Sequence, residues 1–293
     1  MARALVPLLA VALALYASAL RPPAVWAAEL TIDAPASLAA AAARVEAVDL
    51  AQLQSDLRRA GLDLPARIMV ALIPEDDPRA RPVPSWIVGF AAGSSDIVVF
   101  PERVLPYPHD SLESVLRHEV VHLALDVRAG GEELPRWFHE GVAMSVDRGW
   151  GLEGRLRLLL EMAGNPGTAD LARLFALRAQ PEAAQAYGLS AALVSDLRRR
   201  HGDTVPGAIA ARVAGGASFA GAFASETGET PDLAASRAWS AYVRWANWVP
   251  TLTSGSAVWT VILALAGAAW VARRRARVRR REQWGDDDQS SGV

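Results

Sequence analysis

Two histidines and two glutamates in the middle of the chain have the residue types and the spacing of a metal site. Residues 118–122 read His-Glu-Val-Val-His, and Glu140 follows after an interval of seventeen residues. On a helix, positions i and i+4 share one face, so His118 and His122 can direct their ring nitrogens at one ion. Glu119 can then act on a bound water, and Glu140 can supply the third ligand that catalytic zinc sites use. The pattern predicts one Zn²⁺ bound by His118, His122 and Glu140, with Glu119 as the general base.

The helix that must carry the two histidines is marked at both ends. Asp110 and Glu113 have the spacing of a capping box, and Gly130 with Gly131 supplies a stop. Apolar residues at helical spacing fall on the same face as the histidines, so this face should be buried. A histidine on such a face could be an ordinary core residue. A glutamate buried between two histidines, however, needs a cation or a donor, because an unpaired buried carboxylate is costly, and this favours a metal.

The segment around Glu140 has a pattern of its own. Pro135 can open a second helix, Trp137 can anchor it in the core, and Gly141 permits close approach of two backbones. This segment and the His-Glu-x-x-His segment resemble the gluzincin metallopeptidases, most closely the peptidase MA-like branch related to thermolysin. That family has a P-x-W-x-x-E-G-x-A segment, which is carried here by Pro135, Trp137, Glu140, Gly141 and Ala143.

The resemblance covers about residues 60–250. It implies a zincin-like α+β fold, with a small N-terminal mixed sheet and the active-site helix, followed by a mostly helical C-terminal half. Related enzymes steady the oxyanion with a tyrosine or histidine from the helical half, which makes Tyr187 the candidate here; a tyrosine that packs in the core is the alternative. In similar peptidases the strand that corresponds to 87–92 pairs with an extended polypeptide substrate; an ordinary core strand is the alternative here. The strand at 87–92 lacks the glutamate with which aminopeptidases of this clan bind a free amino terminus, which favours internal cleavage.

Two departures from the family pattern lie near the site. The interval between the second histidine and the third ligand is slightly shorter than in relatives, and Met144 stands where relatives often place a second acid. Asp126 lies one turn after His122 and could accept its other ring proton. Arg128 and Arg136 are alternative partners for this carboxylate.

The remaining histidines are not expected to bind the ion. His139 precedes Glu140, and adjacent helix positions point about 100° apart. His109 is expected in a loop and His201 in solvent.

Both ends of the chain have patterns of membrane-targeting segments. Residues 1–28 combine an early arginine, an apolar run and small residues, as in a signal peptide. Residues 251–272 carry no charge and precede seven arginines, which predicts a transmembrane helix with a cytoplasmic tail at 273–293. A buried soluble helix is the alternative. Residues 29–248 are then expected to form one extracytoplasmic peptidase domain that a single pass anchors in the cell membrane.

Composition limits the chemistry and the partners. The chain of 293 residues has no cysteine, which excludes thiol ligands and thiol nucleophiles, and no lysine, which indicates GC-rich coding and a bacterial origin. Residues 29–248 contain 21 arginines and 28 acidic residues, a net charge of −7. A domain with this negative charge has no basic surface of the kind that binds nucleic acid. The sequence does not determine the oligomeric state.

The coarse elements follow from periodicity and turn signals. A helix is expected at 36–61, a strand at 66–74, and a hairpin of strands at 86–91 and 96–100, all before the histidine helix. After the Glu140 helix, further helices are expected near 151–163, 168–177, 182–200, 205–214, 217–225 and 231–246.

These patterns predict a membrane-anchored zinc metallopeptidase that acts as an endopeptidase. Glu119 would take a proton from the zinc-activated water and pass it to the leaving nitrogen. The alternative is a catalytically silent zincin-fold module that binds or scaffolds at the membrane, and the retained Glu119 argues against it.

Overall fold

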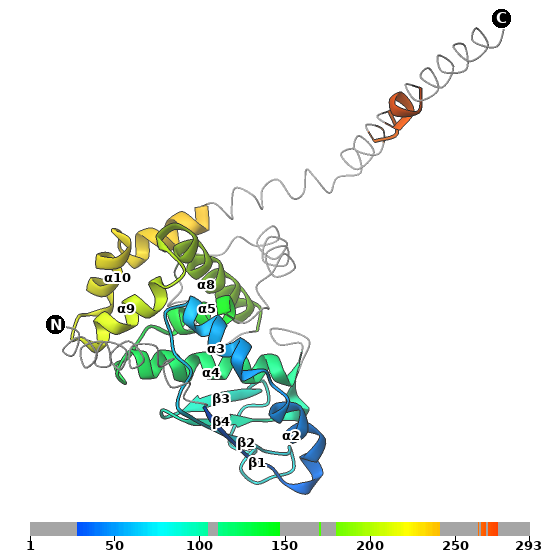
Figure 1. The fold of residues 1–293 in the computed structure, drawn as a ribbon, viewed down its shortest axis with the longest axis vertical. Helices are drawn as coiled ribbons and strands as arrows, with labels where there is room; N and C mark the ends of the chain where they lie inside the picture. Colours follow the sequence, from blue (N-terminus) through cyan, green and yellow to red (C-terminus); the bar gives the residue numbers. More distant parts are fainter. Residues whose placement is uncertain are drawn as a thin grey trace, which may run out of the picture.

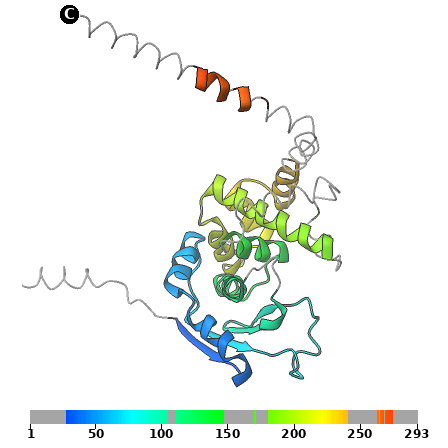
Figure 2. The same cartoon turned by 90° about the vertical axis from the view of Figure 1, so that its right-hand side faces the viewer.

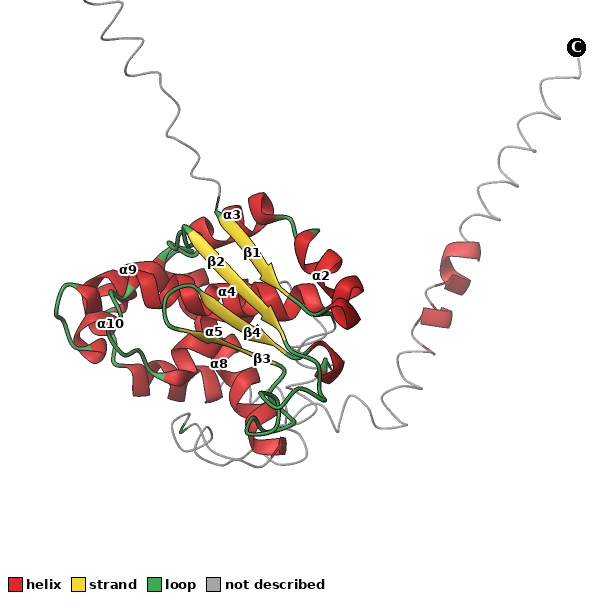
Figure 3. Cartoon of the chain, turned by 90° about the horizontal axis from the view of Figure 1, so that it is seen from below, coloured by secondary structure: helices red, strands yellow, loops and turns green. Residues whose placement is uncertain are grey.

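A four-stranded mixed sheet forms one side of the fold. The computed structural model describes residues 28–104, 111–146, 170, 180–240, 263, 265–267 and 269–274. In this part of the chain the strand order is β1-β2-β4-β3, with bounds Glu29–Asp33, Arg67–Leu72, Asp96–Val99 and Gly89–Ala92 respectively. β1, β2 and β4 run parallel, and β3 lies antiparallel to β4 at the edge. Figure 3 shows the strands side by side, and the expected α+β class with a small mixed sheet is confirmed.

The sheet forms because its strands alternate between two environments. In β2, Ile68, Val70 and Leu72 are buried, while the residues between them are half-buried. β4 repeats this pattern with Ile97 and Val99. These side chains pack into the main hydrophobic core with the helices, as the period of two predicts.

Two short helices lie where one helix at 36–61 was expected, so the prediction of a continuous helix is wrong. A 3₁₀ turn η1, Ala36–Leu38, leads into α2, Ala39–Glu46, and α3, Leu50–Arg59, follows after a break. Asp49 caps α3, because its side chain accepts a hydrogen bond from the Gln52 amide at 2.8 Å. An aspartate in an N-cap satisfies a backbone donor that a continuous helix would have paired internally.

Helix α4, Leu112–Arg128, lies between the sheet and the helical half of the fold (Figure 1). It packs against β3 and β4 on one side and against α5 and α9 on the other. Its N-cap is Ser111, which accepts from the Ser114 amide at 3.1 Å; the expected cap, Asp110, lies outside the described residues. Gly130 ends the helix as predicted, with a left-handed φ of +67°.

The helical half packs closely on α4 through helix α5, Arg136–Val146. It also contains α8 (Gln180–His201), α9 (Val205–Ala214), α10 (Phe219–Thr227) and a helical segment at 231–240. In Figure 2 these helices, coloured green to yellow, lie above the blue and cyan sheet. The mostly helical C-terminal half is therefore confirmed for the described residues, whereas the helices expected near 151–163 and 168–177 lie almost entirely outside them.

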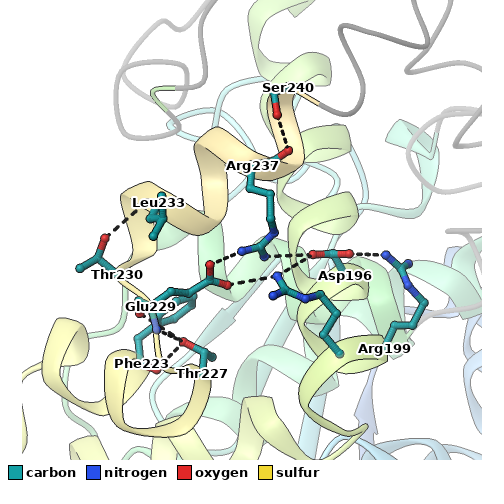
Figure 4. A network of polar contacts seen from close by, with 10 residues as sticks. Asp196, Arg199, Phe223, Thr227, Glu229, Thr230, Leu233, Arg237 and Ser240 are labelled. Atoms are coloured by element: carbon teal, nitrogen blue, oxygen red, sulfur yellow. Dashed lines mark hydrogen bonds and ion pairs between the residues drawn. The ribbon is translucent and has the colours of Figure 1, made fainter.

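A network of ion pairs fastens the segment at 231–240 to α8 (Figure 4). Arg237 bonds to Glu229 and also to Asp196 on α8, with its Nη2 3.1 Å from Asp196 Oδ2. Arg200 on α8 reaches Glu229 Oε1 at 3.4 Å. Each acid thus meets two or more guanidinium groups, which joins the end of the helical half to its longest helix.

The transmembrane helix expected at 251–272 is a wrong prediction. Crossing a bilayer takes about 20 consecutive, mostly apolar residues in one helix. Among the described residues, which include 263, 265–267 and 269–272 of that segment, no helix combines this length with enough apolar character. The longest described helix, α8, ends in three arginines and a histidine. The expected signal peptide at 1–28 lies, except for Ala28, outside the described residues and stays a prediction.

Candidate metal centre

Helix α4 presents His118 and His122 from one face, as their spacing predicts. The two Nε2 atoms lie 3.1 Å apart, and the ring centroids lie 4.7 Å apart with the rings nearly perpendicular. His118 is buried and His122 is largely buried. When two imidazoles direct their Nε2 atoms at each other, the space between these atoms holds either a shared proton or a cation.

Glu140 completes the cluster from helix α5. Pro135 precedes this helix and accepts the first hydrogen bond from Phe138 N at 2.9 Å, which places Glu140 one turn in. Its Oε2 lies 3.3 Å from His118 Nε2 and 3.6 Å from His122 Nε2. Among the described residues, this is the group of three ligand side chains that could bind a metal ion.

The three ligand atoms have the separations that a tetrahedral metal site requires. They form a triangle with edges of 3.1, 3.3 and 3.6 Å. Zinc bonds of about 2.0–2.1 Å at tetrahedral angles would separate neighbouring ligand atoms by about 3.3–3.4 Å. The chemistry of the donor set, two imidazole nitrogens and one carboxylate oxygen, fits the same ion.

The electrostatics of the cluster favour positive charge at its centre. Burial alone would raise the pKa of Glu140, but the hydrogen bond with His118, the close approach of His122 and the charges of both rings outweigh burial and hold that pKa well below its ordinary value. For His122, burial lowers the pKa, and the contact with Glu140 together with the charges of Glu119 and Asp126 raises it to about 8. The surrounding carboxylates therefore favour the charged form of His122 despite its burial.

Glu119 is buried on α4 directly beneath the edge strand β3. A Cβ atom added to Gly89, the first residue of β3, would lie 3.6 Å from Glu119 Cγ and 3.1 Å from Val115 Cγ1. The absence of a side chain at Gly89 thus lets the strand approach the helix where Glu119 lies. Glu119, the candidate base, thus lies against β3 and one position along α4 from His118.

Tyr187 reaches the cluster from helix α8. Its hydroxyl lies beside the guanidinium of Arg136, and close enough to Glu140 and Glu119 for their charges to affect its pKa. Burial, together with these carboxylates, raises the pKa of Tyr187 above its ordinary value, so the hydroxyl stays protonated and can donate. The alternatives were a site residue and a core residue, and the structure places Tyr187 beside the cluster.

Arg136 is the neighbour of the cluster that sequence reasoning missed. It was considered only as a partner of Asp126, but its Nε lies 3.6 Å from Glu140 Oε1. The signal was available, because the two residues are four positions apart on one helix and i, i+4 side chains meet.

Asp126 was expected to accept a ring proton from His122, but its partner is His139. Asp126 Oδ1 lies 3.5 Å from Nε2 of His139, whose ring centroid is 5.5 Å from that of His122. Burial and the nearby His122 lower the pKa of His139 to about 4, so this ring is neutral. His139 is not one of the three clustered ligand side chains, as its helix position predicts.

The structure also gives the surroundings of Met144 and His201. Met144, which departs from the gluzincin pattern, is buried in the core. His201 was expected in solvent, but its Nε2 is buried at the end of α8 and makes no hydrogen bond among the described residues. His109 lies outside the described residues.

Comparison with known proteins gives no match to any family model and none to the curated proteins.

Proposed function

We propose that this chain is a zinc-dependent metallopeptidase of the gluzincin type, with one Zn²⁺ bound by His118, His122 and Glu140. The triangle of ligand atoms, with edges of 3.1–3.6 Å, is the observation that carries the proposal. Three protein ligands, rather than four, are the number that would hold a catalytic rather than a structural zinc. The resemblance of the two motif segments to the peptidase MA-like branch supports the same assignment.

The neighbouring side chains supply the rest of a hydrolytic mechanism. Zn²⁺ held by His118, His122 and Glu140 would polarise the scissile carbonyl and lower the pKa of a bound water to about 7. Glu119, next to His118, accepts a proton from the attacking water and passes it to the amide nitrogen as the C–N bond breaks. The amine leaves with the bonding electron pair, and the carbonyl carbon retains the water oxygen. Tyr187 donates a hydrogen bond to the carbonyl oxygen as negative charge develops on it.

The edge strand β3 favours an extended polypeptide as the substrate. It pairs with β4 alone in the described sheet, and it lies against Glu119 through Gly89. A substrate strand can add to such an edge by main-chain hydrogen bonds, which hold a peptide without reading its sequence. The strand contains no acid that would bind a free amino terminus, and this supports internal cleavage.

Metal content and hydrolysis measured together test the proposal. The 293-residue chain is stripped with a chelator, reloaded with Zn²⁺, and incubated with an unfolded, unmodified protein as a generic substrate. We expect one zinc per chain, internal cleavage products, and loss of cleavage when the chelator returns. A chain that binds one zinc and cuts no peptide would contradict the proposal and favour a binding module instead.

A further inference from the structure

The two oxygens of Glu140 face different neighbours. Oε2 lies 3.3 Å from His118 Nε2 and 3.6 Å from His122 Nε2, whereas Oε1 lies 3.6 Å from Arg136 Nε. A carboxylate that rotates about its last bond can offer either oxygen, or both, to a cation. A guanidinium beside Oε1 opposes this rotation, because turning that oxygen away gives up a charge-assisted contact.

Arg136 also makes a second contact, across the boundary between α5 and α8. Its guanidinium lies beside the hydroxyl of Tyr187, close enough to raise the pKa of the arginine. A guanidinium has donors and no acceptor, so the tyrosine oxygen must accept in this contact. The hydrogen of the Tyr187 hydroxyl therefore points away from Arg136 and can serve a second partner.

We propose that Arg136 is a positioning residue of the metal centre: it holds Glu140 so that one oxygen faces the histidines, and it orients the hydroxyl of Tyr187. The first part requires only that the cluster bind a divalent cation. The second part, on Tyr187, rests on the proposed peptidase function.

A purely structural role for Arg136 would predict a different result. Its side chain is 54% exposed, and exposed ion pairs of this i, i+4 type contribute little to stability. Arg212 offers a matched control, because its side chain is 51% exposed and pairs with Glu226 away from the cluster. If both arginines only stabilise the surface, their removal should have the same small effect on everything measured.

Cobalt binding by the 293-residue chain tests the first part of the proposal. Arg136→Met removes the charge and keeps the approximate length of the side chain. Arg136→Lys keeps the charge but replaces the planar guanidinium group by an ammonium group. Arg212→Met is the control. The readouts are Co²⁺ affinity, by competition with a chelating dye, and the visible absorption of bound Co²⁺, which is more intense for four ligands than for five. We expect Arg136→Met to bind Co²⁺ about 10–100-fold more weakly. Its absorption should weaken as Glu140 binds through both oxygens.

Arg136→Lys and Arg212→Met show whether a loss of affinity is specific to the guanidinium group of Arg136. Arg136→Lys should recover part of the affinity, and Arg212→Met should match the unsubstituted chain. Equal affinity and equal spectra for Arg136→Met and Arg212→Met would overturn the proposal, and so would an unsubstituted chain that binds no Co²⁺. If Arg136→Met fails to fold, Arg136→Gln replaces it with the same expected result.

A double-mutant cycle with zinc-loaded protein tests the second part. Tyr187→Phe should leave Co²⁺ affinity and spectrum unchanged and lower kcat. Arg136→Met should then lower kcat less in the Tyr187→Phe background than in the unsubstituted chain, because the hydroxyl that it orients is already gone. Equal losses in both backgrounds would overturn the orienting role. A chain that binds Co²⁺ but cuts no peptide would overturn the proposed function and this second part, while the spectra still decide the first.

Discussion

Asp56 on helix α3 accepts a hydrogen bond of 2.6 Å from Arg117 on α4, the residue directly before His118. Both side chains are largely buried, with 4% of Asp56 and 13% of Arg117 exposed. Burial alone would raise the pKa of Asp56, but hydrogen bonds from Arg117, Arg59 and Gln52 outweigh burial and lower it. An ion pair thus joins α3 to the turn of α4 that carries the candidate metal ligand His118.

Removal of this carboxylate should destabilise the fold. Asp56→Ala takes away the shared partner of two arginines, and we expect the free energy of unfolding to fall by about 2–3 kcal/mol, somewhat less than for a fully buried pair because both guanidinium groups retain some access to water. Urea unfolding of the 293-residue chain measures the change, with Asp63→Ala, at an exposed position, as the control. A loss no larger than that of the control would show that the pair is only a surface contact.

Gly141 follows the candidate ligand Glu140 and lies in a close contact between α5 and α8. A Cβ atom at position 141 would come within 2.5 Å of the Ser190 carbonyl oxygen and 2.6 Å of Val194 Cγ2. Because one of these atoms belongs to the backbone, the helices must separate to admit a methyl group. We expect Gly141→Ala to cost about 1–3 kcal/mol of stability and to weaken zinc binding through displacement of Glu140.

Thermal unfolding of the metal-free chain and competition for zinc give the two measurements for Gly141→Ala. Gly267→Ala is the control, because no atom lies within 4 Å of the added Cβ there. Unchanged stability and unchanged zinc affinity in Gly141→Ala would contradict the close-packing argument.

Glu119 and His122 should separate catalysis from metal binding. Glu119→Gln keeps the shape of the side chain and removes the base, so zinc should stay bound while cleavage falls by about 10²–10⁴-fold. His122→Ala removes a ligand, so the zinc itself should be lost. Zinc analysis and peptide cleavage on the same samples check both variants, and cleavage that survives in Glu119→Gln would place the chemistry elsewhere.

The metal cluster was predictable because each part of it has a local signal. The i, i+4 spacing of His118 and His122 fixes their common face, and Pro135 fixes the start of the next helix. Arg136 had an equally local signal, because it lies four residues before Glu140 on the same helix. This contact was not predicted from the sequence. The partner of Asp126 was missed for a different reason, since it depends on how α4 and α5 cross.

The N-terminal part shows what a local pattern cannot supply. Strand β1 was not predicted, because its five residues follow the expected signal peptide and its pairing, Glu29 with Arg67, is long-range and parallel. The break between α2 and α3 did have a local signal, the cap residue Asp49, but the alanine-rich periodicity on both sides obscured it. Long-range pairing and competition between signals therefore account for these misses.

Glu113 at the start of α4 pairs with Arg44 on α2 through two hydrogen bonds of 2.9 Å. The contact with Arg44 lowers the pKa of Glu113 from 4.5 to about 2. Because the folded value lies below the ordinary one, the pair stabilises the fold above pH 4.5, and its contribution is lost as the pH falls from 4.5 to 2. The Glu113 side chain is 36% exposed, so solvent screens the pair, and Glu113→Gln should cost at most about 1 kcal/mol at pH 7. At about pH 3 the cost should fall to less than half. Urea unfolding at both pH values, with Glu132→Gln at an exposed position as the control, measures the difference; a cost that stays constant between them would mean that the ionisation of Glu113 does not contribute to stability.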